Sequence, residues 1–260
     1  MLIVVSGSSG AGKNTVINHI LAENDQYLLM QTLTTRQKRP GEKDGFPYYF
    51  VDEATFRQKI SEGEFYEYEN VHGNLYGTSR RILAERLAMG KTLLKDIDVK
   101  GTVNLRNAIG GEVEVKTVFL YVDKEELVSR LIGRGETAID LRLKRYMEEL
   151  SYVEEYDYVI NNRSLSQTAD CIKAIAQGAL PLYIRKSDMN DGEAIHAQKT
   201  CLQNKATAEA MKVALVDGKL YAIDGVSRYL AAKELGVRVA KWIDFAFEAD
   251  LSADWELVSE

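Results

Sequence analysis

The sequence predicts an α/β fold in which a parallel sheet is wrapped by helices, followed by a small α+β module at the C-terminal end. Three observations predict it. Short apolar runs alternate with segments of helical periodicity from Met1 to about Leu180, which is typical of a parallel sheet covered by helices. The loop GSSGAGKNT lies between the first apolar run and the first helical segment. After Pro181 the pattern changes to a hairpin and a short helix.

The expected strands of this sheet are short and apolar, and they are Leu2–Val5, Tyr27–Met30, Thr92–Leu94, Thr117–Tyr121 and Tyr158–Ile160. The expected helices show helical periodicity, and they are Lys13–Glu23, Ile82–Ala88, Gly101–Ala108, Lys124–Gly133 and Ser166–Gln177. The segment Phe46–Tyr76 interrupts the alternation with β-rich, aromatic sequence and a helix-like stretch, Glu53–Ile60. It therefore predicts an inserted subdomain.

The glycine-rich loop between the first strand and the first helix predicts a binding site for a polyphosphate. Glycines let backbone N–H groups converge on phosphate oxygens, and the helix N-terminus and Lys13 add positive charge. The loop departs from G-x-x-x-x-G-K-[ST] at Asn14, whose amide oxygen could bind magnesium directly or through water. The alternative is an ordinary strand-to-helix turn. The expected phosphate-binding residues are Gly7, Ser8, Ser9, Gly10, Ala11, Gly12, Lys13, Asn14 and Thr15.

Four further segments narrow the class of protein. They read TLTTRQKRPGE (Thr32–Glu42), GFPYYF (Gly45–Phe50), GEFYEYENVHGNLYGTS (Gly63–Ser79) and LLKDIDVKG (Leu93–Gly101). In this order and spacing they resemble guanylate kinase, from Met1 to about Leu180. The resemblance implies a cytoplasmic P-loop nucleoside monophosphate kinase that transfers the γ-phosphate of ATP to GMP, with dGMP as a candidate second acceptor and Mg2+ accompanying ATP. It also implies an acceptor-binding subdomain at about residues 33–80 and a lid at about residues 130–145.

Two arginines and two tyrosines are candidates for binding the acceptor phosphate. Arg36 and Arg39 lie in a polar loop, and guanidinium groups suit bidentate binding of a phosphate. Tyr48 and Tyr76 can donate phenolic hydrogen bonds to the same oxygens. The resemblance implies this role for all four, whereas without the flanking motifs the arginines would be read as solvated surface charge.

The candidate for reading the acceptor base is Glu67, which lies between aromatic residues where burying an unpaired carboxylate is costly. The N1–H and N2 amino groups of guanine match a carboxylate, whereas adenine presents an acceptor at N1. The resemblance implies this role for Glu67 and adds Thr32, Thr78 and Asp98 to the base pocket. The alternative is a strand residue that faces water.

Asp96 ends a short apolar strand, where a carboxylate linked to magnesium is common in phosphate-loop enzymes. The preceding residue, Lys95, departs from the family pattern, which usually has an apolar residue there. Its charge must either extend to solvent or reach the phosphates.

The lid residues follow from helical spacing and from the resemblance. Arg130 and Arg134 lie one turn apart on one helix face, and Arg142 follows after a segment that is shorter than the family pattern. The resemblance implies that these arginines and the loop residue Lys13, together with Arg36, are catalytic, and that Asn162 lies near the adenine of ATP. The alternative for Arg142 is a basic helix face in water.

Composition excludes several other classes. The net charge of −6 disfavours a general nucleic-acid or anionic-membrane partner. Cys171 and Cys201 are far apart and lack metal-site spacing, so they are expected to be reduced thiols. No leader or membrane-length apolar run is expected.

The C-terminal part is expected to form a separate module, which gives domains at residues 1–185 and 193–260. Lys186–Gly192 is polar and turn-rich and predicts a linker or a domain boundary. Asp217-Gly218 predicts a hairpin turn before a helix at Ser227–Leu235. The segment Leu215–Gly236 faintly resembles the ParB-like fold. Residues 186–260 carry 9 Lys and Arg against 13 Asp and Glu, which disfavours DNA binding.

The expected role of this module is packing or contact with a partner, either a second copy of the chain or another protein, and Arg228 is expected to pair with Asp224. Two alternatives to a GMP kinase remain: a kinase of another nucleoside monophosphate, and an interaction module that keeps the fold and has lost turnover.

Overall fold

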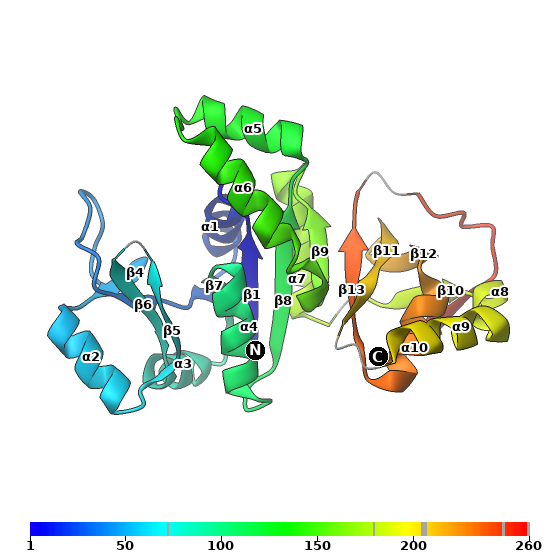
Figure 1. Ribbon diagram of the computed structural model, residues 1–260, viewed down its shortest axis with the longest axis horizontal. Helices are drawn as coiled ribbons and strands as arrows, with labels where there is room; N and C mark the ends of the chain where they lie inside the picture. The colour runs from blue at the N-terminus through cyan, green and yellow to red at the C-terminus, as the bar shows by residue number, and fades with distance from the viewer. Residues whose placement is uncertain (72, 179, 204–206, 246–247, 259–260) are drawn as a thin grey trace. The chain divides into compact units, whose positions relative to one another are not determined.

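The structure is a computed structural model that describes residues 1–71, 73–178, 180–203, 207–245 and 248–258. It divides into two compact units, each of which combines two stretches of the chain (Figure 1). Unit 1 comprises Met1–Ser6 and Ile17–Lys116, and unit 2 comprises Gly7–Val16 and Thr117–Glu260. Helix α1 (Lys13–Glu23) begins in unit 2 and ends in unit 1.

Unit 1 contains three parallel strands in the order β1-β7-β2. They are β1 (Leu2–Gly7), β7 (Thr92–Asp96) and β2 (Tyr27–Leu29), and its helices at this sheet are α3 (Arg80–Leu87) and α4 (Val99–Ile109). Burial of apolar side chains stabilises the sheet, because Leu2, Val4 and Leu93 lie in one core cluster. These elements confirm the expected alternation.

The inserted region of unit 1 forms a second sheet of four strands in the order β4-β3-β6-β5. The strands are β4 (Tyr48–Phe50), β3 (Thr32–Thr34), β6 (Asn74–Ser79) and β5 (Phe65–Val71). Helix α2 (Glu53–Ser61) begins at the N-cap Asp52 and packs Phe56 against Phe65, with ring centroids 4.5 Å apart. The β-rich interruption with one helix is therefore present as predicted.

Unit 2 contains a largely parallel sheet in the order β8-β9-β13-β11-β12-β10-β14. Strands β8, β9, β13 and β11 run parallel, whereas β12 and β14 are antiparallel to β11 and β10 respectively. The strands are β8 (Val115–Tyr121), β9 (Tyr158–Asn161), β13 (Arg238–Ile243), β11 (Thr207–Val216), β12 (Lys219–Asp224), β10 (Leu182–Arg185) and β14 (Trp255–Val258). Its other elements are α5 (Lys124–Gly133), α6 (Ile139–Leu150), the 3-10 helix η1 (Val153–Glu155), α7 (Leu165–Ala176), α8 (Lys186–Met189), α9 (Gly192–Leu202) and α10 (Val226–Leu235). No helix within the described ranges is long and apolar enough to cross a membrane.

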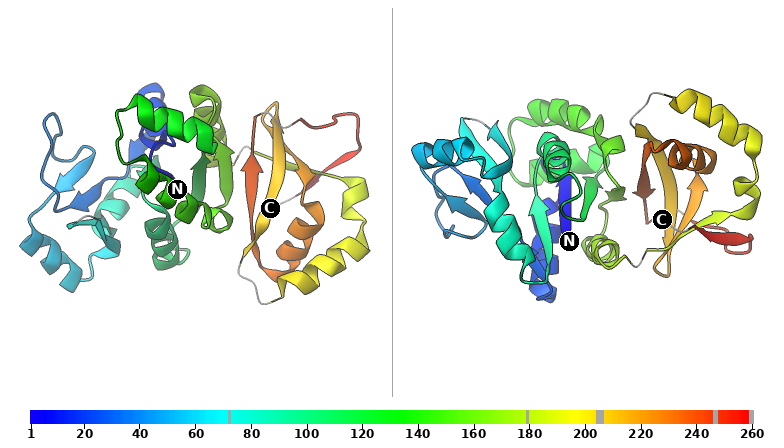
Figure 2. Two further views of the ribbon diagram at one scale, coloured as in Figure 1. Left: turned by 45° about the horizontal axis from the view of Figure 1, so that its top comes forward. Right: turned by 90° about the horizontal axis from the view of Figure 1, so that it is seen from below.

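The predicted hairpin is confirmed by β11 and β12. Asp217 and Gly218 both have positive φ, at 48° and 73°, which is the conformation that a two-residue type I′ turn requires. Helix α10 ends at Gly236, whose φ of 66° is typical of a left-handed C-terminal residue. Figure 2 shows α9 and α10 side by side, and Leu202 packs there against Ala231.

Two expectations for the C-terminal part are wrong. Residues Lys186–Gly192 are not a turn-rich segment, because α8 and the start of α9 occupy them. The polar residues of this stretch act as helix-capping residues instead, since the Asp191 carboxylate accepts a hydrogen bond from the Ala194 N–H at 2.9 Å. Arg228 pairs with Glu209 at 3.0 Å rather than with Asp224.

The C-terminal strand β13 pairs in parallel with β9, so the sheet of unit 2 is continuous from β8 to β14. Side chains reinforce this pairing. The Asn161 amide donates to the buried Asp244 carboxylate at 2.7 Å, and Arg238 pairs with Asp157 at 2.8 Å. The Trp242 and Tyr121 ring centroids lie 4.9 Å apart.

Candidate active site

The loop after β1 has a backbone conformation that favours glycine. Gly7, Gly10 and Gly12 have φ of 136°, 96° and 92°. A Cβ at Gly7 would lie 2.5 Å from the Leu120 carbonyl oxygen, and one at Gly12 would lie 2.8 Å from the Asn162 amide nitrogen. Any residue with a side chain at Gly7 or Gly12 would therefore clash with Leu120 or Asn162.

The charge of Lys13 is held over this loop. Its ammonium donates to the Gly7 carbonyl at 2.7 Å and lies 3.4 Å from the Ser8 carbonyl. Ser8 is buried, and its hydroxyl has no hydrogen-bond partner among the residues that the structure describes. Asn14 and Thr15 are exposed in the first turn of α1. The loop thus combines a cation, backbone N–H groups and a helix N-terminus, which suits a polyphosphate.

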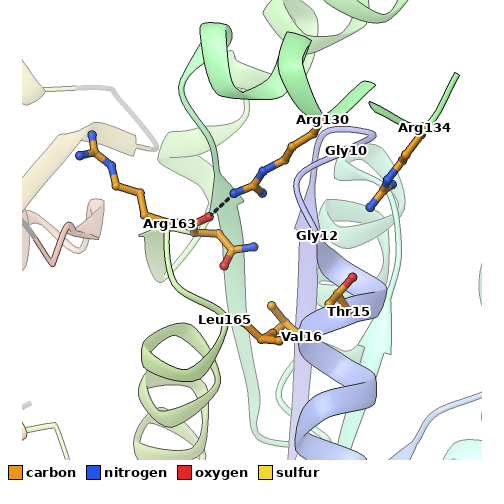
Figure 3. A pocket seen from close by; sticks show the side chains of 9 residues that line it. Gly10, Gly12, Thr15, Val16, Arg130, Arg134, Arg163 and Leu165 are labelled. Atoms are coloured by element: carbon orange, nitrogen blue, oxygen red, sulfur yellow. Dashed lines mark hydrogen bonds between the residues drawn. The ribbon is translucent and has the colours of Figure 1, made fainter. Parts of the chain in front are cut away.

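A cavity of about 280 Å³ lies beside the loop within unit 2 (Figure 3). Asn162 connects its two walls, because its side-chain amide donates to the Ala11 carbonyl at 2.6 Å while its backbone carbonyl accepts from Arg130 at 2.9 Å. Arg130 is also paired with Glu126 at 2.8 Å. The lining residues are Gly10, Gly12, Thr15, Val16, Arg130, Arg134, Asn162, Arg163 and Leu165.

The lid arginines do not all reach this cavity. Arg130 lies on α5 and Arg134 directly follows this helix, and both side chains line the cavity (Figure 3). Arg142 on α6 is paired with Glu136 at 2.8 Å and is not a lining residue, so its catalytic role stays a prediction. Sequence reasoning missed Arg163, which lines the cavity while its guanidinium points away and pairs with Asp123 at 2.9 Å. The sequence feature that could have indicated Arg163 is its position directly after Asn162.

The expected acceptor-phosphate residues cluster in unit 1. The Arg36 guanidinium donates to both oxygens of Glu42, at 2.7 and 3.0 Å, and lies 5.3 Å from the Tyr48 ring centroid. The Tyr48 and Tyr76 rings pack edge to face, with ring centroids 6.0 Å apart. The side chain of Arg39 is exposed, but its backbone N–H donates to the same Glu42 carboxylate at 2.8 Å.

Glu42 is a positioning residue that sequence reasoning missed. Its hydrogen bond from Arg36 lowers its pKa, and the same bond raises the pKa of Arg36. The pair is thus ionised throughout the physiological range, with Arg36 held against Tyr48. The sequence feature that could have indicated this pair is an acidic residue six positions after Arg36 in the same polar loop.

Two of the residues expected to bind the base, Glu67 and Thr78, lie on the neighbouring strands β5 and β6 of unit 1. Glu67 is buried and pairs in register with Thr78, whose hydroxyl donates a short hydrogen bond to its carboxylate. Burial raises the pKa of Glu67, and the charge of Lys95 opposes this effect. The alternative of a glutamate that faces water is therefore wrong.

Lys95 differs from both expectations for it, because it extends neither to solvent nor along a phosphate site. Its side chain is fully buried, and its amine donates to the Thr32 hydroxyl at 2.7 Å. Burial lowers the pKa of Lys95, while Glu67 and Asp96 raise it. A lysine thus lies inside the candidate base pocket.

The two aspartates after β7 have different surroundings. Asp98 is the N-cap of α4, and one carboxylate oxygen accepts from the Gly101 N–H at 2.9 Å. Its charge still raises the pKa of Glu67. Asp96 ends β7 near Tyr48, whose pKa is raised mainly by burial and also by this carboxylate. The metal role of Asp96 and Asn14 stays a prediction.

Comparison with known proteins agrees with this geometry. The guanylate kinase family model matches residues 1–179. A guanylate kinase of Aromatoleum aromaticum is 38% identical over 190 residues, which is 72% of this chain and 92% of that protein. One of Bartonella henselae is 40% identical over 177 residues, or 67% of this chain and 79% of that protein.

A solved structure agrees as well. The crystal structure of guanylate kinase from Anaplasma phagocytophilum is 32% identical, with a TM-score of 0.54, and covers 68% of this chain and 85% of that chain. The family match ends before the C-terminal strands and helices, so the ParB-like resemblance stays a prediction. The chain therefore belongs to the guanylate kinase family and is an ATP-dependent nucleoside monophosphate kinase.

Proposed function

We propose that this chain transfers the γ-phosphate of ATP to GMP, with dGMP as a second acceptor. The choice of guanine rests on Glu67, whose carboxylate is buried and accepts a hydrogen bond from the Thr78 hydroxyl. The N1–H and N2 amino groups of guanine would pair with this carboxylate, whereas the N1 of adenine would leave it facing another acceptor. The relatives of known name are guanylate kinases, which supports the same acceptor.

The residues of each unit have separate tasks in this reaction. In unit 2, the loop and Lys13 would bind the β- and γ-phosphates of ATP, and Arg130 and Arg134 would neutralise charge on the transferring group. Asn162 would contact the adenine side of the same cavity. In unit 1, Arg36 with Arg39, Tyr48 and Tyr76 would bind the phosphate of GMP, and Thr32, Thr78 and Asp98 would complete the base pocket.

The donor set fits Mg2+ that is held mainly by the phosphates of ATP. Such an ion needs only one or two oxygen ligands from the protein, and Asn14 offers an exposed amide oxygen while Asp96 offers a carboxylate. When bound, Mg2+ neutralises phosphate charge. We expect direct in-line transfer, because positioning and charge neutralisation suffice for this chemistry. A kinetically competent phosphorylated residue would contradict it.

A coupled assay of ADP formation tests the acceptor. GMP, dGMP, AMP, UMP and CMP are compared at equal concentration with saturating ATP and Mg2+. We expect GMP to give the highest kcat/KM. Preference for another nucleotide would indicate a different nucleoside monophosphate kinase, and ADP formation with none of them would indicate an interaction module without turnover.

A further inference from the structure

The short segment at the end of β9 joins the walls of the cavity. The side-chain amide of Asn162 donates to the Ala11 carbonyl of the glycine-rich loop at 2.6 Å, and its backbone carbonyl accepts from Arg130 of α5 at 2.9 Å. The next residue, Arg163, lines the same cavity. A shift of this segment would therefore change the shape of the cavity.

One carboxylate oxygen of the C-terminal part contacts the residues on both sides of Asn162. Asp244 directly follows β13, which pairs in parallel with β9, so it lies at the carboxyl edge of the sheet, where open α/β sheets bind their ligands. Its Oδ2 accepts from the Asn161 amide at 2.7 Å and lies 3.8 Å from the Arg163 guanidinium. Asp244 is buried, so solvent does not compete for these contacts.

The same strand also reaches the start of α5. The Trp242 ring packs against the Tyr121 ring, and the Tyr121 hydroxyl donates to one oxygen of Asp123 at 3.2 Å. Arg163 donates to the other oxygen at 2.9 Å. Asp123 is the N-cap residue of α5, yet within the described ranges its carboxylate makes no capping hydrogen bond to the helix. Tyr121 and Arg163 thus hold the start of α5, and each contacts a C-terminal residue, Trp242 or Asp244.

We propose that Asp244 is a positioning residue for ATP, which acts through Asn161 and Arg163 on the wall of the cavity. Asp244 holds both neighbours of Asn162, and Asn162 in turn contacts the glycine-rich loop and α5. The C-terminal strand β13 is thus a part of the donor site, although the family match ends at residue 179. This inference rests on the proposed function for the identity of the ligand, because the cavity is assigned to ATP there.

The test is a measurement of ATP binding in the full-length chain. Calorimetric titration with a non-hydrolysable ATP analogue and Mg2+ gives a Kd, and steady-state kinetics give the KM for ATP and for GMP. Asp244→Ala removes both contacts of the carboxylate. We expect the Kd to rise about fivefold, the order of effect typical of residues that act on a site through their neighbours. The KM for ATP should rise in parallel and the KM for GMP much less, because the residues proposed to bind GMP belong to unit 1.

Arg238→Met is the matched control. Arg238 pairs with Asp157 at 2.8 Å, at the amino ends of β13 and β9 and thus at the opposite edge of the sheet from Asp244. Its removal weakens the same strand pairing without touching the residues around Asn162. Denaturant titration should show a loss of stability in both variants, whereas the Kd for the analogue should stay unchanged in Arg238→Met.

Asn161→Val tests the route by which Asp244 acts, because it removes the amide that donates to the carboxylate. It should raise the Kd by itself. In this background Asp244→Ala should raise the Kd less than it does in the wild type, since the contact between the two side chains is already absent. An undiminished effect of Asp244→Ala would show that Asp244 does not act through Asn161, and it would overturn the inference.

The outcomes separate this inference from the proposed function. If the wild-type chain binds the analogue but does not phosphorylate GMP, the proposed acceptor is wrong, and the comparison of Kd values still decides the role of Asp244. If the wild type does not bind the analogue, both are wrong. If Asp244→Ala and Arg238→Met raise the Kd equally, or neither raises it, Asp244 has only a structural role and the inference is overturned. Should Asp244→Ala fail to fold, Asn161→Val decides: an unchanged Kd there also overturns it.

Discussion

Glu67 combines burial with charge, and this combination makes its replacement informative. Its carboxylate accepts from Thr78 and is 8% exposed, so a change in its hydrogen-bonding capacity is not compensated by solvent. Glu67→Gln keeps the shape but replaces one acceptor oxygen with a donor. We expect kcat/KM for GMP to fall by roughly ten- to several-hundred-fold. Glu69→Gln, two residues further on the same strand, is the control. Normal GMP turnover by Glu67→Gln would place the base pocket elsewhere.

The same residue predicts the acid side of the pH profile. The ionised carboxylate accepts from both guanine groups, and burial raises its pKa above the ordinary value of 4.5. As pH falls, Glu67 therefore takes up a proton earlier than an exposed glutamate would, and kcat/KM for GMP declines. Lys95 acts in the other direction, while Asp98 and Glu69 act in the same direction as burial. Measured profiles should show this decline above pH 4.5 in the wild type, and Glu67→Gln should lack that step.

Lys13 and Asn14 are neighbours with different expected sensitivity. The Lys13 ammonium lies on the loop at 2.7 Å from the Gly7 carbonyl, where the β- and γ-phosphates would bind. Lys13→Ala should therefore remove most activity. Asn14 is exposed, and if its amide oxygen replaces a hydroxyl ligand of magnesium, Asn14→Ser should preserve or improve activity. Steady-state kinetics at varied Mg2+ checks both, and a folded but inactive Asn14→Ser would reveal a further contact of the amide.

At the level of single residues, the sequence singled out candidate side chains but not the partners that the structure gives them. Arg36 was predicted from its loop, whereas the role of Glu42 depends on how that loop folds back. The burial of Lys95 could not be predicted, because a lone lysine is costly to bury and its partner Thr32 lies 63 residues away in the chain. The two residues lie in different sheets, Thr32 on β3 and Lys95 on β7, so only the tertiary fold of unit 1 brings them together.

Among the elements, prediction succeeded where periodicity is local. Helices α1 and α5 have the predicted bounds, since their apolar spacing lies within one segment. The short strands β10 and β14 were missed, because each has four residues and pairs with segments that are distant in the chain. The helix α9 was missed because its N-terminal residues, including the N-cap Asp191, are also typical of turns.

The pairing of β9 with β13 gives an element-scale prediction. Asp244 is buried and accepts from the Asn161 amide at 2.7 Å, directly before the cavity residue Asn162. Asp244→Ala leaves that amide unsatisfied, so we expect a loss of about 1–3 kcal/mol in the free energy of unfolding. The KM for ATP should rise more than the KM for GMP. Denaturant titration and kinetics measure both, and Asp254→Ala, an exposed aspartate paired with Lys186, is the control. Equal effects in the two variants would show that the buried Asn161–Asp244 contact contributes no more than an exposed ion pair.

For the whole molecule, the question is how much the C-terminal strands and helices contribute to activity. The family match covers residues 1–179, which include the cavity and the residues proposed to bind GMP. Strand β10 (Leu182–Arg185) pairs with β12 and β14, so a cut at Leu180 removes that group of strands together. A cut at Arg185, the boundary expected from the sequence, keeps β10 without its partners.

We predict that a chain ending at Leu180 folds and keeps GMP kinase activity but is less stable and less soluble than the full chain. The cavity residues, Lys13, Glu67 and Arg36 all precede the cut, so the groups that we propose to bind the two nucleotides remain. Removal of β13 leaves β9 as an edge strand with unpaired backbone groups and takes Asp244 away from Asn161. Thermal unfolding, size-exclusion chromatography and the coupled assay should show a lower Tm, concentration-dependent association and a kcat close to that of the full chain. The chain ending at Arg185 should associate at least as readily, because β10 adds a second unpaired strand. If the shorter chain is folded and monomeric yet inactive, the C-terminal strands and helices contribute to catalysis, and their description as an accessory module is wrong.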